Sequence, residues 1–361
     1  AGSGALQSVY VTSSWKNSSY TGSNMFYNCT SLVGQKGTRY SPSHVDGDYS
    51  RIDGGTAGTY GYFWQGRQQS NTAWWMIKSP ADGGVLQVWP VSSNRGNLES
   101  FIDWPGDAPW GSRITEINSF EVRGSGNTVG VQTNGSLAYM FYGANNMTTA
   151  YFKADASTNR GTFSTTGASS LKGMFQGCEK LKSLDLTGFN VSSVTDFSLL
   201  FQNCRELEEL KLDGWKTTVA KKMDGTFGYC RKLEELDVGD WTVSNVTTMV
   251  GLFEGCKKLK ELNLASWNPS ACTNFGYTFA YCDELTKIDL SSFDTSSAES
   301  MHSMFSGLKK LISLDLSAFN TANVTDMETM FSRCVELTTI YVSSGWSTSE
   351  ATKGTDTFSE C

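Results

Sequence analysis

The chain has 361 residues, a formal net charge of −7 at pH 7 and a sequence pI near 5.0. Aromatic residues make up 12% of it and there are only 6 prolines, which excludes disorder as the dominant state. The acidic balance argues against nucleic acid as a partner, because a phosphate-binding surface needs clustered lysine and arginine. No apolar run approaches the roughly 18 residues that a membrane span needs.

The chain begins with a segment that recurs at its end. LQSVYVTSSW, at residues 6–15, matches LTTIYVSSGW, at residues 337–346, and the cysteines that follow are Cys29 and Cys361. We therefore interpret residues 1–32 as the last coil of a preceding repeat array. Because terminal coils of repeat proteins normally carry a polar cap, we expect a tandem continuation of the polypeptide or head-to-tail self-association. Residues 33–72, rich in Gly, Ser and Tyr, are predicted to form an irregular cap and connector.

A tryptophan-rich segment, residues 73–116, is predicted to form a small β cap. AWWMIK (73–78) and VLQVW (85–89) flank the turn signal SPADGG, which predicts a β-hairpin. We expect five tryptophans to form an aromatic core here, with an exposed glycan-stacking platform as the alternative. They are Trp74, Trp75, Trp89, Trp104 and Trp110. Residues 117–170 are interpreted as two degenerate lead-in repeats, of which 153–170 is a loop insertion.

From residue 171 to 361 one motif, F-x-x-C-x-x-L-x-x-L-x-L, recurs with a 26-residue period. The L-x-L part alternates with a period of two, which predicts a short strand in every copy. The cysteine position is held by Cys178, Cys204, Cys230, Cys256, Cys282 and Cys334, and once by Leu308. Cysteines stacked in this way point side by side rather than toward each other, so we expect buried free thiols and no disulfides.

The other half of each copy has a different period. Val324, Met327, Met330, Phe331 and Cys334 fall at i, i+3, i+6, i+7 and i+10, which predicts one face of a helix. Four polar residues directly before such runs are predicted helix N-caps: Ser193, Asn245, Ser297 and Asn323. The sequence thus predicts an α/β leucine-rich-repeat solenoid with a parallel concave sheet and helices on the convex side, plus the small aromatic-rich β cap.

The copies resemble the repeats of BspA-like leucine-rich-repeat surface proteins of bacteria. The unit MFSGLKKLISLDLSAFNTANVTDMETMF carries this resemblance, and the segment MFYNCTSLVGQKGTRYSPSHVDGDYSRIDGGTAGTYGYF, from residue 25, resembles the piece that closes such arrays. The resemblance implies an extracellular protein, on the cell surface or secreted, that adheres to host matrix or to a cell-surface protein or glycan.

The sequence contains few of the residues and motifs that are typical of enzymes. It has two histidines, His44 and His302, and none of the motifs G-x-S-x-G, H-E-x-x-H or C-x-x-C. His44 lies in a glycine-rich stretch without a partner histidine, and His302 is expected on the outer surface of a predicted helix. We therefore expect no catalytic residue, no metal site and no cofactor. Carboxylates are numerous, so composition leaves a carbohydrate-active enzyme open as a third alternative.

The residues that flank the inward-facing strand pair predict a binding face. Acids outnumber lysines there, and acids stacked about 5 Å apart repel each other, so their presence on one face favours a cationic or protein partner. Solvation and protection of sheet edges is the other explanation, and calcium is a lesser alternative. The predicted binding residues are Glu209, Lys211, Asp213, Glu235, Asp237, Glu261, Asn263, Asp289, Asp315 and Tyr341.

One aromatic residue follows each predicted strand. We expect these rings to stack in the core, with a row of exposed rings that holds a polysaccharide as the alternative. They are Phe189, Trp215, Trp241, Trp267, Phe293, Phe319 and Trp346.

The sequence as a whole favours a non-enzymatic extracellular surface protein that binds through its solenoid. A structural spacer in a tandem-repeat stalk or fibre is the alternative.

Overall fold

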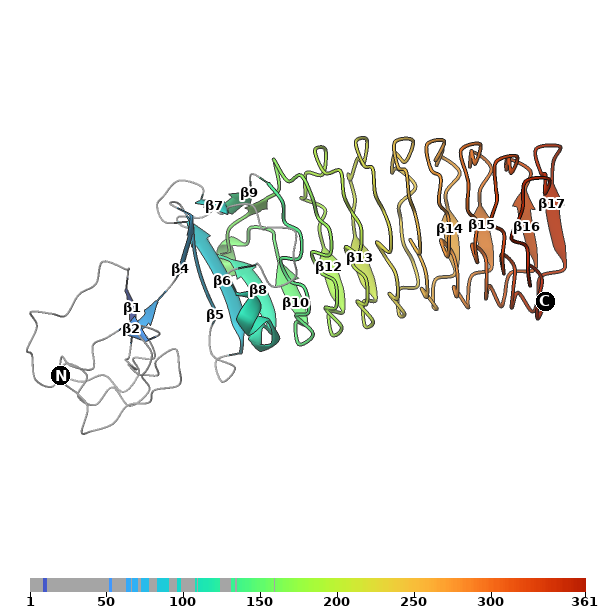
Figure 1. Ribbon diagram of the computed structural model, residues 1–361. Coiled ribbons are helices and arrows are strands. Elements are labelled where there is room, and N and C mark those ends of the chain that lie inside the picture. Colours follow the sequence, from blue (N-terminus) through green and yellow to red (C-terminus); the bar gives the residue numbers. More distant parts are fainter. Residues whose placement is uncertain are drawn as a thin grey trace, which may run out of the picture.

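The structure, a computed structural model, describes residues 135–361 apart from Asn159, and before them residues 110–123, 131–133, 83–90, Ala108 and the short strands β1 to β5 and β7. From residue 135 onward the chain winds into coils that stack in a row up to the C-terminus (Figure 1). Residues 1–8, 12–51, which include His44, and 54–62 lie outside the described residues, as does Trp104.

The strands before the repeats are β1 (Val9–Val11), β2 (Ile52–Asp53), β3 (Phe63–Gln65), β4 (Arg67–Ser70), β5 (Ala73–Ile77), β6 (Val85–Pro90), β7 (Gly96–Leu98), β8 (Ser119–Val122), β9 (Val131–Thr133), β10 (Thr149–Tyr151) and β11 (Phe163–Ser164). Two short 3-10 helices, η3 (Gly111–Glu116) and η4 (Ala156–Thr158), lie among them. The repeats carry β12 (Ser183–Asp185), β13 (Glu209–Lys211), β14 (Glu261–Asn263), β15 (Lys287–Asp289), β16 (Ser313–Leu316) and β17 (Thr339–Val342).

A five-stranded mixed sheet leads into the coils, in the order β10-β8-β6-β5-β4. The predicted hairpin is confirmed, because β5 and β6 pair antiparallel with Trp74 opposite Trp89. The pairings β6–β8 and β8–β10 are parallel, so the sheet changes from antiparallel to parallel pairing at β6, where the coils begin. Of the five predicted cap tryptophans only the side chain of Trp110 is described; it is buried, and its Nε1 donates to the Met140 carbonyl at 2.8 Å.

The two lead-in repeats bury apolar residues at the spacing of the motif. Ile117, Phe120 and Val122 are fully buried, and so are Phe141, Ala144 and Met147 of the next coil. The expected loop at residues 153–170 is wrong in part, because it contains η4 and β11. β11 pairs in parallel with β9, and Phe163 packs into the core, so part of the insertion belongs to the three-stranded sheet β11-β9-β7.

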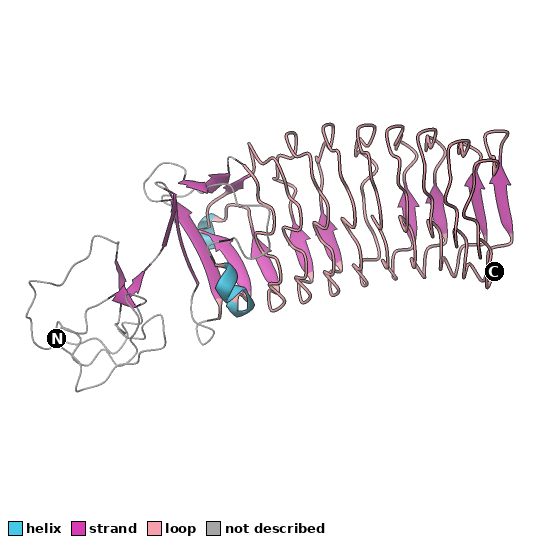
Figure 2. Cartoon of the chain, viewed as in Figure 1, coloured by secondary structure: helices cyan, strands magenta, loops and turns pink. Residues whose placement is uncertain are grey.

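The predicted helices on the convex side are absent from the described residues (Figure 2). In residues 324–334 the N–H groups of Met330 and Cys334 donate three residues back, to the carbonyls of Met327 and Phe331, at 3.2 and 3.3 Å. Between them, Phe331 N–H donates to the Thr357 carbonyl of the next coil at 2.9 Å. An α-helix would need every N–H to reach four residues back within the same segment. This half of each coil is instead a run of consecutive turns, which we call the turn side.

Two positions of every turn side take positive φ, which a continuing right-handed helix excludes. In the motif F-x-x-C the second of these positions directly precedes the cysteine, as at Gly177 with φ 76° and Gly255 with φ 69°. Glycine fills both positions only in some coils. The positive-φ residues other than glycine are Tyr139, Leu199, Asn203, Tyr229, Tyr277, Tyr281, Ser303, Thr329, Arg333, Asp356 and Glu360.

The predicted N-caps serve a different purpose, because no helix follows them. Asn245 and Asn323 donate through Nδ2 to carbonyls of the preceding coil, at 3.0 and 2.9 Å. Ser297 Oγ does the same to Ser270 at 2.7 Å, and Ser193 lies in a turn closed by Val194. The side chains of Asn245, Ser297 and Asn323 therefore connect neighbouring coils.

The strands of the repeats pair in parallel, but the predicted continuous sheet is divided into the pairs β12–β13, β14–β15 and β16–β17. The inward residues of these strands, such as Leu184, Leu262 and Leu314, are buried as predicted. On the turn side a second parallel ladder of single bridges crosses all the coils. It links Ser170, Asp196, Lys222, Thr248, Asn274, Ser300, Asp326 and Lys353 in sequence.

Two columns of rings fill the core. The phenylalanines of F-x-x-C stack with centroids 5.2–5.8 Å apart from Phe175 to Phe358. The rings that follow the strands, from Phe189 to Phe319, are also buried, and Trp346 is partly buried. The predicted core ladder is therefore confirmed, and the alternative of an exposed row of rings is wrong for these residues.

The repeated cysteines are buried free thiols, as predicted. Each Sγ donates to the carbonyl of the phenylalanine in the preceding coil, for example from Cys256 to Phe227 at 3.1 Å. Burial raises the pKa of Cys256 to about 12, so the thiol is neutral at ordinary pH. Cys272, which is out of phase with the others, is also free and buried. Among the described residues, no helix is both long and apolar enough to cross a bilayer.

Candidate functional site

The outward-pointing residues of β12 to β17, together with the equivalent residues 235–237, form what we call the strand face. Strand pairing fixes their direction, because alternate residues of a strand point to opposite sides. In β14, for example, Leu262 is buried while Glu261 and Asn263 on either side are exposed. All ten predicted binding residues lie on this face or just beyond its strands, and Tyr341 is 56% exposed.

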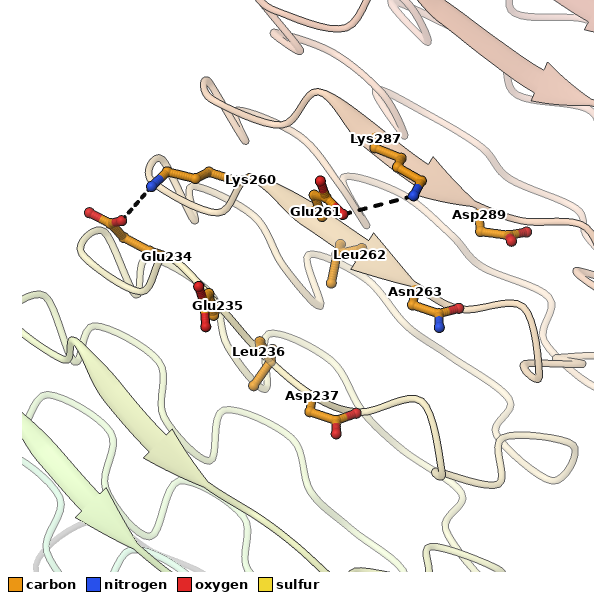
Figure 3. Close-up of a pocket in the computed structure, with 10 residues that line it drawn as sticks. All are labelled: Glu234, Glu235, Leu236, Asp237, Lys260, Glu261, Leu262, Asn263, Lys287 and Asp289. Atoms are coloured by element: carbon orange, nitrogen blue, oxygen red, sulfur yellow. Dashed lines mark hydrogen bonds and ion pairs between the residues drawn. The ribbon is translucent and has the colours of Figure 1, made fainter.

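A groove of about 650 Å³ crosses the middle of the strand face (Figure 3). It is lined by Glu234, Glu235, Leu236, Asp237, Lys260, Glu261, Leu262, Asn263, Lys287 and Asp289. Five predicted binding residues lie here: Glu235, Asp237, Glu261, Asn263 and Asp289. The other five, Glu209, Lys211, Asp213, Asp315 and Tyr341, lie outside the groove, on the coils to either side of it.

The groove coincides with the interruption of the sheet between β13 and β14. Residues 234–237 occupy the place of a strand in this coil but do not form one. Lys260 N–H still donates to the Glu234 carbonyl, at a long 3.3 Å. The loosened contact between these coils leaves room for a hollow whose floor includes Leu236 and Leu262.

Lysines neutralise only part of the charge in the groove. Lys260 Nζ lies 2.6 Å from Glu234 Oε2 and lowers the pKa of that carboxyl. Lys287 Nζ lies 3.9 Å from Glu261 Oε2, with both side chains more than half exposed, so this pair stabilises the fold little. For Glu209 and Glu235, no ion pair is formed with any residue that the structure describes. Both glutamates are exposed.

Several predicted binding residues have a structural role instead. The Oδ1 atoms of Asp237, Asn263, Asp289 and Asp315 accept the backbone N–H two residues later, at 3.2, 3.3, 3.0 and 2.9 Å. Such Asx turns satisfy backbone donors where a strand ends. The hydroxyl and N–H of Ser317 lower the pKa of Asp315. Acids at this position are therefore explained without a ligand.

The glutamates at the start of the strand have no such explanation. Glu209, Glu235 and Glu261 occupy the same position in three successive coils, and their side chains accept no backbone bond among the described residues. Figure 3 shows Glu235 and Glu261 on the same face of neighbouring coils. This row presents three carboxylates to solvent along the solenoid, an arrangement that can bind several cationic groups in line.

Five groove residues were not among the predicted binding residues: Leu236, Leu262, Lys287, Glu234 and Lys260. Of these, Glu234 and Lys260 come just before the strand positions. Their signal was present in the sequence. At this position, four residues after the repeated cysteine, Glu208, Glu234 and Lys260 follow one another at 26-residue spacing. The change from acid to base at the same position of adjacent coils predicts an ion pair between coils.

Solved structures with a detectable likeness include two bacterial leucine-rich-repeat proteins. One from Bacteroides ovatus is 24% identical, with a TM-score of 0.35, over 50% of this chain and 42% of that protein. One from Eubacterium ventriosum is 17% identical, with a TM-score of 0.29, over 76% of this chain and 83% of that protein. The chain thus spans less than half the length of the Bacteroides ovatus protein. These TM-scores are too low to carry an argument, and the repeat architecture is shown by the ladders of the chain itself.

A comparison with curated proteins finds no match. A family model matches three overlapping segments, residues 135–262, 169–287 and 251–361. Together these segments contain every complete coil and more than half of the chain. The chain therefore belongs to the family described as "Mycoplasma protein of unknown function, DUF285".

Proposed function

We propose that the chain is a non-enzymatic binding module whose strand face holds a basic segment of a protein partner. The observation that carries the proposal is the row Glu209, Glu235 and Glu261, of which only Glu261 forms an ion pair with a residue that the structure describes, Lys287 at 3.9 Å. By its resemblance to BspA-like proteins, the proposed setting is the cell surface or the secreted state. The proposed partner is a host-matrix or cell-surface protein.

The geometry of the row suits an extended peptide that runs along the solenoid. Successive coils place their core rings 5.5–5.7 Å apart in this region, which sets the spacing of the carboxylates. Side chains on one side of an extended peptide repeat about every 7 Å, and long lysine or arginine side chains can adapt to the difference. The two leucines on the groove floor offer apolar contact to the stems of such side chains.

A protein partner fits this surface better than a glycan. Glycan sites use exposed aromatic rings for stacking, and the rings that follow the strands are buried from Phe189 to Phe319. Tyr341 is an exposed ring on the strand face, but it lies two coils beyond β15 and apart from the groove. We therefore favour protein over polysaccharide within the class that the sequence predicted.

Binding can be measured with a fluorescent peptide that carries arginine at alternate positions. We expect Glu209→Gln/Glu235→Gln/Glu261→Gln to weaken binding at least about tenfold at 0.1 M salt, where charges about 10 Å apart are still felt. The matched control, Glu299→Gln/Glu336→Gln/Glu350→Gln, removes the same charge elsewhere and should change affinity less than about threefold. Equal losses in the two triple variants, or no binding by the unmodified chain, would contradict the proposal.

The alternative function is a structural spacer, favoured by the stacking of the coils in a long row (Figure 1). Attachment of the intact protein to host cells or matrix separates the two functions. The strand-face triple variant should abolish attachment while circular dichroism shows an unchanged fold. A spacer would attach equally well with either triple variant. The groove is an open trough rather than a deep pocket, so we also expect no glycosidase activity.

A further inference from the structure

One cluster on the turn side brings together three side chains that bind metals in proteins. Within the part of the chain that the structure describes, His302, Asp326 and Glu328 are the one group of this kind, with their ligand atoms all within 4.8 Å of one another. His302 belongs to one coil and the two acids belong to the next. All three are partly buried rather than fully exposed.

Backbone bonds of the ladder hold the cluster in place. Ser303 N–H donates to the Glu328 carbonyl at 2.9 Å, which fixes the two coils at this point. Glu328 N–H donates to Asp326 Oδ1 at 3.1 Å, which orients that carboxylate. The other oxygen of Asp326 pairs with Lys353 at 3.3 Å, so Oδ1 is left facing the histidine.

Tyr277 fixes the histidine ring from the other side. Its hydroxyl lies 2.8 Å from His302 Nε2. When Nε2–H donates to this oxygen, the lone pair of the neutral ring sits on Nδ1, which faces the carboxylates. Histidines that bind metals usually have their second nitrogen held by such a hydrogen bond.

The distances favour a metal ion over a proton between these groups. Nδ1 lies 3.6 Å from Asp326 Oδ1 and 3.9 Å from Glu328 Oε2. A protonated Nδ1–H would be expected to form a hydrogen bond of about 2.7–2.9 Å to one of them. Ligands of a tetrahedral zinc ion, each about 2.0–2.2 Å from it, lie about 3.4 Å apart. The observed separations of 3.6 and 3.9 Å are therefore closer to those between the ligands of a zinc ion than to a hydrogen bond.

The cluster also departs from the repeat. The position of His302 is occupied in the five preceding coils by Lys172, Ser198, Asp224, Val250 and Gly276. None of these places a histidine against acids of the next coil, so the cluster is specific to one place rather than a feature of every turn side.

We propose that His302 Nδ1, Asp326 and Glu328 bind one divalent transition-metal ion of the zinc class, with Tyr277 as the residue that orients the histidine. A nitrogen ligand disfavours calcium and magnesium, which take oxygen ligands. The ion joins two successive coils. Because it binds the folded state, it raises the stability of this part of the solenoid in proportion to the logarithm of its concentration.

The test is calorimetric titration with zinc chloride alone, on a Cys29→Ser/Cys361→Ser parent. The exposed thiol of Cys361 would otherwise compete, whereas burial raises the pKa of the inner thiols Cys272 and Cys334 to about 12 and about 11. We expect one ion per chain. His302→Ala and Glu328→Gln should each lose most of this affinity, and Tyr277→Phe should lose about tenfold to a hundredfold with the stoichiometry unchanged. His44→Ala, which removes the other histidine, should bind as the parent does.

Two further readouts do not depend on heat of binding. The visible absorption of bound Co²⁺ should indicate nitrogen and oxygen ligands and disappear in His302→Ala. Zinc should raise the thermal midpoint of the parent but not that of His302→Ala, whose metal-free circular dichroism should match the parent. Equal zinc affinity in His302→Ala, or no binding by the parent up to about 1 mM zinc, overturns the proposal.

Discussion

The strand side and the turn side of each coil solve the same problem, the pairing of backbone groups between neighbouring coils, in different ways. On the strand side, ordinary extended residues pair in parallel, as Leu262 does with Ile288. On the turn side, alternate N–H groups bond within the coil and across to the next, and two residues per coil take positive φ. The turn side therefore constrains residue type through the backbone, whereas outward residues of the strand side are free to vary in charge.

The largest expected effect comes from a side chain at a positive-φ position. At Gly255, φ is 69° and an added Cβ would lie 2.7 Å from the Tyr229 ring. Gly255→Val should lower the free energy of unfolding by about 2–4 kcal/mol, through backbone strain and overpacking. Gly239→Val on the strand side is the matched control, because its Cβ would meet nothing closer than 3.6 Å. We expect a change of less than about 1 kcal/mol there. Similar urea midpoints for the two variants would show that the sides are equally tolerant.

A smaller effect is expected from the buried thiols of the repeated cysteines, each of which donates to a phenylalanine carbonyl of the preceding coil. Cys256→Ala removes a buried sulfur and its bond to the Phe227 carbonyl, and should lower the free energy of unfolding by about 1–2 kcal/mol. Cys361→Ala, at an exposed thiol, should have little effect.

The same thiols can be tested by alkylation of the native protein followed by mass spectrometry. Burial raises the pKa of Cys256 from 9.0 to about 12, so the stabilisation by the neutral thiol is fully present below about pH 9 and is lost as pH rises from there through about 12. At pH 8 we expect rapid modification of Cys361 and none of Cys256 before unfolding. Rapid modification of Cys256 would contradict the buried packing.

The smallest effect is expected on the strand side, where Asp315 holds an Asx turn. Asp315→Ala leaves the N–H of Ser317 without its acceptor and should lower the free energy of unfolding by about 0.5–1.5 kcal/mol, while Asp315→Asn retains an acceptor and should lower it less. Glu235→Gln, with no backbone bond to lose, should change it by less than about 0.5 kcal/mol.

Asp315 also makes the free energy of unfolding depend on pH. The Ser317 contacts lower the pKa of Asp315 below its unfolded value. Its stabilisation is therefore fully present above about pH 4 and is lost as pH falls through the lower folded pKa. Urea denaturation at pH 5 and at pH 3 should show that the free energy of unfolding falls less for Asp315→Asn than for the unmodified chain. An equal loss would mean that this carboxylate makes no contribution.

The sequence predicted which residues are inside better than it predicted their conformation. Met327, Met330, Phe331 and Cys334 are buried as the i, i+3 and i+7 spacing requires, but consecutive turns produce nearly the same spacing as a helix. The distinguishing signal was the glycine before the repeated cysteine, as in Phe253 to Cys256, because glycine is unfavourable inside a helix and favourable at positive φ. In other coils Tyr281 and Arg333 occupy that position and conceal the signal.

The candidate site was predicted in part for a similar reason. The order Asp-Leu-Ser at Asp289 and Asp315 is an Asx-turn signal, and it separates structural acids from the glutamates at the start of the strand. The groove itself depends on the absence of a strand between β13 and β14, and the residue types at 234–237 do not predict this absence. Local pattern specifies an acidic face, whereas the spacing between coils places the hollow in it.

The sequence by itself determined the 26-residue coil, its inward residues, the stacked rings and thiols, and the acidic strand face, because each of these features recurs with the period of the repeat. Only the tertiary structure decided that the turn side is not helical, since its alternate N–H groups find partners in the next coil rather than in their own. It also brought His302 to Asp326 and Glu328, which are 24 and 26 residues away in sequence. Contacts between coils join positions that no local pattern connects.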